Sequence, residues 1–301
     1  MTQQENHNMG NLNTHHIMLV MKESIRRAVK EIRRQRFNFE AKEKITDYSK
    51  EIDMVTSADI AAQEIFKHLL DEHFPFAGII AEENFARKCT ATDANYYFTI
   101  DPLDGTKAYG RRQSHAIASM ISFVYNGTAE ATCIGDVMTE EFYINRPGSE
   151  NVYRVSENEV YEKLSIDESK TLRNQHLALR TDPRKYSKIV QNMTDPQKED
   201  RLFKEIQTSV GSIGTMFARL WKSEIGGIVI QPSTQTPWDM TPLIAPSYKL
   251  GFICVKLEKN TFTEYNMQPL LENTNIENEL LFIHKSRLPE LKEWFTNLYN
   301  I

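Results

Sequence analysis

The sequence predicts a protein of two layered parts, an α+β first half with an antiparallel sheet and an α/β second half. Three observations support this prediction. The chain has 301 residues, of which 40% are hydrophobic, and this is enough for a large buried core. The first half shows two helical patterns followed by short β-rich segments. In the second half, segments of strand and helix character alternate.

The first half is expected to begin with a disordered arm over residues 1–14, which are polar and have no hydrophobic period. Between Ile17 and Phe37, apolar residues recur at three- and four-residue steps, which predicts an amphipathic helix. Ser57 is the expected N-cap of a second helix, which ends before Pro75. Asn126-Gly127 is expected to form a hairpin turn. β-Branched and aromatic residues predict strands over 78–81, 96–100, 117–125, 131–137 and 141–145.

The least apolar interior stretch, residues 147–173, predicts the junction between the halves. We therefore divide the chain into a first half over 15–150 and a second half over 151–301. In the second half, strands are expected over 176–179, 225–230, 251–255 and 280–283. Helices are expected from Gly211-Ser212 through Leu220, after Trp238-Asp239, and over 288–299.

The charge balance and the cysteines exclude some classes of protein. Lys and Arg total 36 and Asp and Glu total 41, so the formal net charge is −5, which argues against a general nucleic-acid binder. Cys89, Cys133 and Cys254 are widely spaced without a CxxC pattern, as in reduced intracellular proteins. The apolar run 17–21 stops at Lys22 and lacks a signal-peptide pattern. We expect a cytoplasmic protein without a membrane partner.

Two carboxylates follow a predicted hydrophobic strand in the segment Asp101–Thr106, whose sequence is DPLDGT. Pro102 fixes φ, and Gly105 permits a backbone conformation that other residues resist. Both carboxylates and the Leu103 carbonyl can therefore converge on one point, and converging hard oxygens suit Mg²⁺. An ordinary Asp-Pro turn is the structural alternative for this segment.

Three other segments also place acids at the ends of predicted elements. The strand over 78–81 leads into Glu82-Glu83, acids occupy both ends of Asp53–Asp59, and Trp238-Asp239 comes before a helix. Each has an ordinary structural interpretation: a solvated charge pair, a complement to the helix dipole, or an N-cap. Their joint occurrence in one chain favours a shared metal site.

Taken in order, these motifs resemble the signatures of the inositol monophosphatase superfamily of Mg²⁺-dependent, lithium-sensitive phosphatases. The motifs are Asp53-x-Val55-Thr56-x-x-Asp59, Glu82-Glu83, DPLDGT and Trp238-Asp239. The resemblance implies a layered α-β-α-β-α sandwich of the inositol monophosphatase and fructose-1,6-bisphosphatase type. It also implies two or three Mg²⁺ ions, a small phosphorylated substrate and a homodimer.

The resemblance further implies a role for each site residue. Asp59 and Thr106 would orient the attacking water and accept its proton. The implied metal ligands are Glu82, Asp101, the Leu103 carbonyl, Asp104 and Asp239. The implied substrate contacts are Gly105, Thr106, Gly211, Ser212 and Ile213. Independently of the resemblance, carboxylates crowded in this way would repel one another unless divalent cations lay between them.

Some residues depart from the family pattern. Inositol-selective members have an acid shortly before the Trp-Asp pair, whereas Gln231–Pro237 contains none, although Gln231 could still bond a polyol. Lys107, Arg111 and Arg112 resemble the branch that removes the 3′-phosphate of adenosine 3′,5′-bisphosphate, and they could receive a second phosphate. A basic exposed loop is the alternative for these three residues.

We therefore expect a Mg²⁺-dependent phosphomonoesterase that hydrolyses a small phosphate ester of the inositol monophosphate or sugar phosphate class. One alternative is a 3′(2′),5′-bisphosphate nucleotidase. An alternative of another class is a catalytically idle family member that acts as a binding or regulatory protein.

Overall fold

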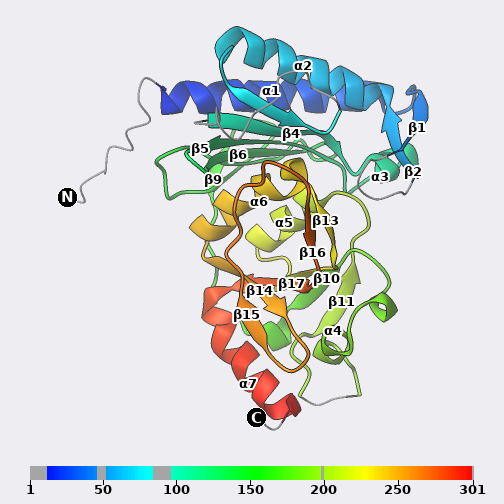
Figure 1. Ribbon diagram of the computed structural model, residues 1–301, viewed down its shortest axis with the longest axis vertical. Coiled ribbons are helices and arrows are strands. Elements are labelled where there is room, and N and C mark those ends of the chain that lie inside the picture. Colours follow the sequence, from blue (N-terminus) through cyan, green and yellow to red (C-terminus); the bar gives the residue numbers. More distant parts are fainter. Residues whose placement is uncertain (1–11, 46–51, 84–95, 198–199, 300–301) are drawn as a thin grey trace, which may run out of the picture.

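The computed structural model describes residues 12–45, 52–83, 96–197 and 200–299. Two long helices, α1 (Thr14–Gln35) and α2 (Ser57–His73), form the outer layer at the top of Figure 1. The apolar period of α1 buries Ile17, Met21 and Ile25 completely, because one face of this helix packs on the sheet beneath it. Of the predicted arm, residues 1–11 lie outside the described residues, and Asn13 is the N-cap of α1.

The N-cap of α2 is Thr56, so the prediction of Ser57 at this position is wrong by one residue. The Thr56 hydroxyl accepts a hydrogen bond from Ala58 N at 3.2 Å, and Thr56 N donates to Asp59 Oδ2 at 2.8 Å. This reciprocal capping box satisfies N–H groups that the first turn leaves free. It also fixes the side chain of Asp59 at the start of the helix.

A hairpin that the sequence analysis missed precedes α2. It pairs β1 (Ala41–Ile45) with β2 (Ile52–Thr56) in antiparallel register. The charged residues Lys42, Glu43 and Lys44 follow one another in β1. The strand therefore lacks the alternation that identifies a half-buried strand.

The first sheet has seven strands in the order β3-β4-β5-β6-β7-β8-β9. β3 runs parallel to β4, and the other neighbours are antiparallel. Asn126 and Gly127 have positive φ in the turn between β5 and β6, as predicted. The strands are β3 (Gly78–Ala81), β4 (Tyr96–Asp104), β5 (Ala118–Tyr125), β6 (Thr128–Asp136), β7 (Phe142–Asn145), β8 (Tyr153–Val155) and β9 (Tyr161–Lys163).

β8 and β9 lie inside the stretch 147–173, which the sequence analysis took as the junction. They extend the first sheet past residue 150, where the boundary was expected. Their polar composition reflects their place at the sheet edge, since every residue of β9 is exposed. The low hydrophobicity of this stretch therefore reflects the exposed edge of the first sheet.

The second sheet has six strands in the order β11-β10-β12-β17-β14-β15. β10 runs parallel to both of its neighbours, whereas the pairs from β12 to β15 are antiparallel. A separate short pair joins β13 (Ser233–Gln235) to β16 (Thr274–Ile276). The six strands are β10 (His176–Leu179), β11 (Glu205–Thr208), β12 (Gly227–Ile230), β14 (Phe252–Leu257), β15 (Phe262–Glu264) and β17 (Glu279–His284).

Two helices, α5 (Ile213–Trp221) and α6 (Pro237–Lys249), lie between the two sheets (Figure 1). Both are buried almost all round, as expected of a layer covered on two sides. Beyond the second sheet lie α4 (Lys188–Met193) and α7 (Leu288–Tyr299). A short helix, α3 (Thr106–Gly110), follows β4.

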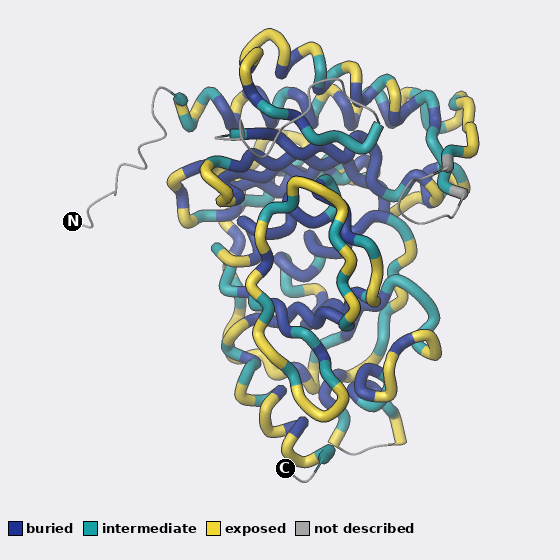
Figure 2. Tube along the Cα trace, in the orientation of Figure 1, coloured by how far each residue is buried: buried dark blue, intermediate teal, exposed yellow. Residues whose placement is uncertain are grey.

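The layers are therefore helix, sheet, helix, sheet and helix, which confirms the predicted α-β-α-β-α sandwich. Figure 2 shows the sheets and the middle helices as mostly buried, with exposed residues concentrated at loops and outer helix faces. Cys133 and Cys254 are buried free thiols, and Cys89 lies outside the described residues. In the described part of the chain, no helix is both long and apolar enough to cross a membrane.

Candidate active site

The DPLDGT segment continues strand β4 as far as Asp104, where the sequence analysis expected a turn after Ile100. Asp101 pairs with Met120 of β5, and Asp104 pairs with Ala118, so β4 has one extra residue between the two acids. An extra residue in one strand is a β-bulge, which bends the strand and redirects its side chains. The bulge lets both carboxylates point to one side.

Two glycines allow the halves of the chain to approach closely beside these acids. Gly105 has φ of +94°, and a Cβ there would lie 2.6 Å from the carbonyl oxygen of Ala116. Gly211 has φ of +129°, and its Cβ would lie 2.5 Å from the same oxygen. No other residue fits either place without displacing backbone. The start of α5 therefore lies directly against the turn after β4.

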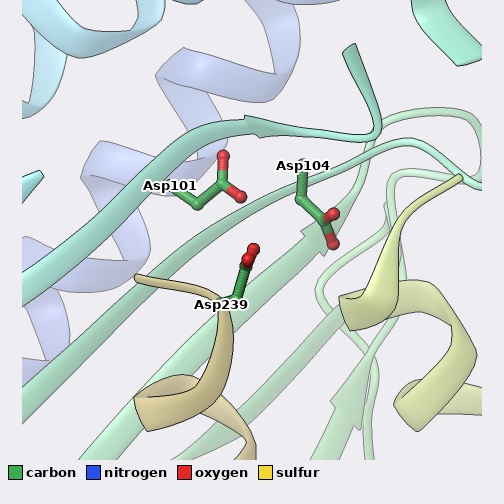
Figure 3. Close-up of side chains that lie close together, drawn as sticks. All are labelled: Asp101, Asp104 and Asp239. Atoms are coloured by element: carbon green, nitrogen blue, oxygen red, sulfur yellow. The ribbon is translucent and has the colours of Figure 1, made fainter. Parts of the chain in front are cut away.

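Three carboxylates form a cluster in this region (Figure 3). Asp101 and Asp104 come from β4, and Asp239 comes from the first turn of α6. One oxygen from each lies within 4.8 Å of the others. Asp101 and Asp104 are only 2% and 5% exposed. These are three of the four predicted metal-binding carboxylates.

Burial and mutual repulsion weaken the acidity of the cluster. Burial raises the pKa of Asp104 to about 6. Burial, followed by the charge of Glu82, raises the pKa of Asp101 well above its ordinary value. The pKa of Asp239 is also raised by burial. Groups held in this way favour a nearby cation, which removes the cost of placing negative charges together.

Asp104 also joins the first sheet to α5. Its carboxylate accepts hydrogen bonds from Ser212 Oγ at 2.5 Å, Ile213 N at 3.1 Å and Gly214 N at 2.7 Å. Ser212 and Ile213 were predicted to border the substrate. The structure places them against the carboxylate of Asp104, and neither lines the pocket described below.

Asp101 has a buried carboxylate oxygen that the described protein groups leave unsatisfied. Its Oδ1 atom is buried and has no hydrogen-bond partner within the described residues. Buried carboxylate oxygens are almost always paired, because an unpaired one loses its hydration without compensation. The residues therefore fit a divalent cation bound by hard oxygen ligands.

The side chains of Asp59 and Thr106 contact each other, as expected of a pair that acts together. Thr106 Oγ1 is 3.1 Å from Asp59 Oδ1 and 2.9 Å from the Leu103 carbonyl oxygen, and its single proton can be donated to either acceptor. Asp59 is fully buried, and burial raises its pKa to about 6. A carboxylate with a raised pKa, held by a hydroxyl, is suited to accepting a proton near neutral pH.

Glu82, the fourth predicted carboxylate ligand, is paired with a lysine. Lys44 Nζ of strand β1 lies 2.8 Å from Glu82 Oε1 and also contacts Glu83 Oε1. Burial raises the pKa of Glu82 to about 8 even though Lys44 opposes this shift. Lys44 could not be found from the local sequence pattern, because β1 does not show the alternation of a half-buried strand.

A pocket of about 260 Å³ opens over the carboxylate cluster. It brings together all five predicted metal ligands and part of the predicted substrate site, whereas Asp59 and Arg112 do not line it. The lining residues are Asp53, Glu82, Asp101, Leu103, Asp104, Gly105, Thr106, Lys107, Arg111, Arg180, Val210, Gly211, Trp238 and Asp239.

The three predicted second-phosphate cations are placed differently. Lys107 lines the pocket, but its Nζ lies 3.5 Å from Asp53 Oδ1. Arg111 also lines the pocket and donates to Gln113 Oε1 at 3.3 Å. Arg112 lies over the ring of Phe37 and does not line the pocket, so its part in binding a second phosphate stays a prediction.

Arg180 is a pocket residue that the sequence analysis missed. It directly follows β10 and donates a hydrogen bond from its guanidinium to Gly211 O at 2.9 Å. Its charge lowers the pKa of Asp104 and of Asp239, partly offsetting burial. The sequence does contain a signal for Arg180, because a charged residue directly follows the buried strand β10.

Gln231, expected to be able to bond a polyol, is engaged elsewhere. Its Oε1 accepts a hydrogen bond from Thr181 Oγ1 at 2.7 Å, and its Nε2 donates to Lys185 O at 3.0 Å. It does not line the pocket. The side-chain amide therefore stabilises the loop that follows β10.

The two sheets with their helix layers, and the acid cluster between them, define a layered α/β protein with a buried acidic pocket. The chain belongs to the inositol monophosphatase family, whose model matches residues 15–282. Among curated relatives, Nus factor SuhB of Escherichia coli strain K12 is 32% identical over 91 residues, which are 30% of this chain and 33% of that protein. Nus factor SuhB of Pseudomonas aeruginosa is 34% identical over 95 residues, or 31% and 35% of the two chains. The match thus spans about a third of these relatives' length.

Solved structures show the same fold over nearly the whole chain. An IMPase/NADP phosphatase complexed with NADP and Ca²⁺ has a TM-score of 0.71 at 15% identity, covering 96% of this chain and 97% of that one. The extragenic suppressor protein suhB from Bartonella henselae has a TM-score of 0.68 at 16% identity, covering 93% and 98%. These similarities establish the architecture alone.

Proposed function

We propose that the protein is a metal-dependent phosphomonoesterase that acts on a small phosphate ester. The principal support is the unpaired, buried oxygen of Asp101 within a cluster of three carboxylates beneath an open pocket. Asp101, Asp104, Asp239, Glu82 and the Leu103 carbonyl would hold two or three Mg²⁺ ions. Bound Mg²⁺ would activate a water molecule and neutralise charge on the phosphate.

The chain's own residues would position the reaction around that centre. Asp59 accepts a hydrogen bond from the capping box and is held ready to receive a proton through the hydroxyl of Thr106. The backbone at Gly105 and Thr106 borders the pocket and would contact phosphate oxygens. Positioning and charge stabilisation supply most of the catalysis in phosphoryl transfer.

A phosphate-release assay over a panel of esters tests this function. The panel contains inositol phosphates, sugar phosphates, histidinol phosphate and adenosine 3′,5′-bisphosphate, each with and without Mg²⁺. We expect release from at least one ester, loss of that release after exhaustive EDTA treatment, and its return with added Mg²⁺. Turnover that persists without divalent cations would contradict the metal-dependent mechanism.

A second candidate function is supported by the basic wall of the pocket. Lys107, Arg111 and Arg180 face the pocket from two different layers of the fold. Two of these cations are arginines, which bind phosphate in a bidentate manner. This wall supports a substrate with a second anionic group, as in a 3′(2′),5′-bisphosphate nucleotide.

Adjacent arginines offer a matched test of the second candidate. Arg111→Met removes a charge that lines the pocket, whereas Arg112→Met removes the same charge outside it. If a second phosphate binds at this wall, Arg111→Met should raise KM for the bisphosphate roughly tenfold to 150-fold, the equivalent of about 1.5–3 kcal/mol. Arg112→Met should change KM little. Equal effects on a monophosphate and a bisphosphate would leave the simple monoesterase as the function.

The catalytically idle alternative predicts a different pattern. Such a protein would bind Mg²⁺ or Mn²⁺ in a calorimetric titration and release no phosphate from any ester of the panel. The curated relatives carry the name Nus factor and no enzyme name, which is the reason for testing this alternative. The homodimer and inhibition by lithium stay predictions from the resemblance, and the cytoplasmic location stays a prediction from the cysteines and the lack of a signal-peptide pattern.

A further inference from the structure

Lys44 places a positive charge among the acids of the pocket. Its Nζ lies 2.8 Å from Glu82 Oε1 and also contacts the carboxylate of Glu83. All three side chains are largely shielded, with 19%, 13% and 9% exposure for Lys44, Glu82 and Glu83. Glu82 itself lines the pocket with the carboxylate cluster. An ion pair in this setting is screened much less than one at the surface.

The backbone of Glu82 and Glu83 is held without help from Lys44. Glu82 N donates to Ile100 O at 3.2 Å, and Glu83 N donates to Gln63 Oε1 at 3.1 Å. Gln63 Nε2 in turn donates to Glu83 O. Strand β4 and helix α2 therefore place this dipeptide, and Lys44 contacts only its carboxylates. A purely positioning role for Lys44 is thus largely redundant.

We propose that Lys44 competes with the divalent cation for the carboxylate of Glu82 and so sets the metal affinity of the site. This inference rests on the proposed function, because it assumes that Glu82 binds metal. The ammonium occupies one oxygen of Glu82, and its charge repels a divalent ion approaching the same carboxylate. Metal binding at Glu82 would then require Lys44 to withdraw, which couples the β1–β2 hairpin to occupancy of the site.

The test is calorimetric titration of the full chain with Mg²⁺ and with Mn²⁺. Lys44→Met should tighten binding by about tenfold or more, since it removes both the competing donor and the repelling charge. Lys44→Arg keeps the charge and should bind close to wild type. Lys42→Met is the matched control, because Lys42 lies on the same strand, is exposed, and has no ion pair within the described residues.

Affinity of Lys44→Met equal to or weaker than that of Lys42→Met would overturn the proposal. If Lys44→Met fails to fold by circular dichroism, Lys44→Gln removes the charge and keeps one hydrogen-bond donor. It should bind Mg²⁺ more tightly than Lys42→Met, by less than is expected of Lys44→Met. If wild type binds neither ion and releases no phosphate, the proposed function and this inference both fail. If wild type binds metal and releases phosphate while the variants match the Lys42→Met control, only this inference fails.

Discussion

Asp101→Asn is expected to lower phosphate release by about a thousandfold or more and to weaken Mg²⁺ binding more than Asp59→Asn does. Asp101 lies in the carboxylate cluster, is almost fully buried, and has an oxygen with no partner among the described residues. An amide keeps the shape of the carboxylate but removes its charge. A bound metal stabilises the transition state by several kcal/mol, and losing that stabilisation corresponds to a fall of about a thousandfold in rate.

Two comparisons show whether the effect is specific to the metal site. Asp59→Asn leaves all predicted metal ligands intact, so its Mg²⁺ affinity should stay near wild type while kcat falls. Asp136→Asn removes a carboxylate outside the pocket, at the end of β6, and should change neither quantity greatly. A Mg²⁺ titration in which Asp59→Asn binds more weakly than Asp101→Asn would show that the two roles are interchanged.

The second large effect is expected at the pair formed by Asp59 and Thr106. Asp59→Asn and Thr106→Ala should each lower kcat by about a hundredfold or more, the range for a positioned proton acceptor. The double variant should be little worse than the more damaging single change. Thr106 Oγ1 lies 3.1 Å from the fully buried Asp59, so the two groups act as one unit and their effects should not add.

Single-turnover kinetics of the single and double variants would measure this coupling, and the same kinetics over a range of pH would test the ionisation of Asp59. Asp59 must be ionised to accept a proton, and burial raises its pKa to about 6. Activity should therefore fall as the pH drops through this region in wild type, and Asp59→Asn should lose that acidic limb. Fully additive losses in the double variant would show that the two residues act independently.

The acids at the strand ends were predictable from sequence because their chemistry and order are local features. The DPLDGT segment holds two acids and a glycine that the close approach requires, and Asp239 falls at a helix start as expected. Their convergence follows from the layered fold that the resemblance implied. The residue types alone thus indicated a cation site.

The basic partners of these acids could not be predicted in the same way. Lys44 lies on a strand whose run of charged residues gives no strand pattern. It reaches Glu82 because the hairpin packs beside α2 and α3. Arg180 meets the pocket because β10 ends there, a fact of sheet order that no local pattern contains. The N-cap was misplaced by one residue because Ser57 and Thr56 are adjacent and both are favourable capping residues.

The three hydrogen bonds that Asp104 accepts from Ser212, Ile213 and Gly214 have a consequence for how the protein matures. Each partner is 108 to 110 residues away along the chain, so these bonds form only once β4 and the start of α5 have come together. A nascent or truncated chain would thus present the DPLDGT acids without the donors that orient Asp104. A cation that selects the oriented cluster stabilises the completed fold over its precursors.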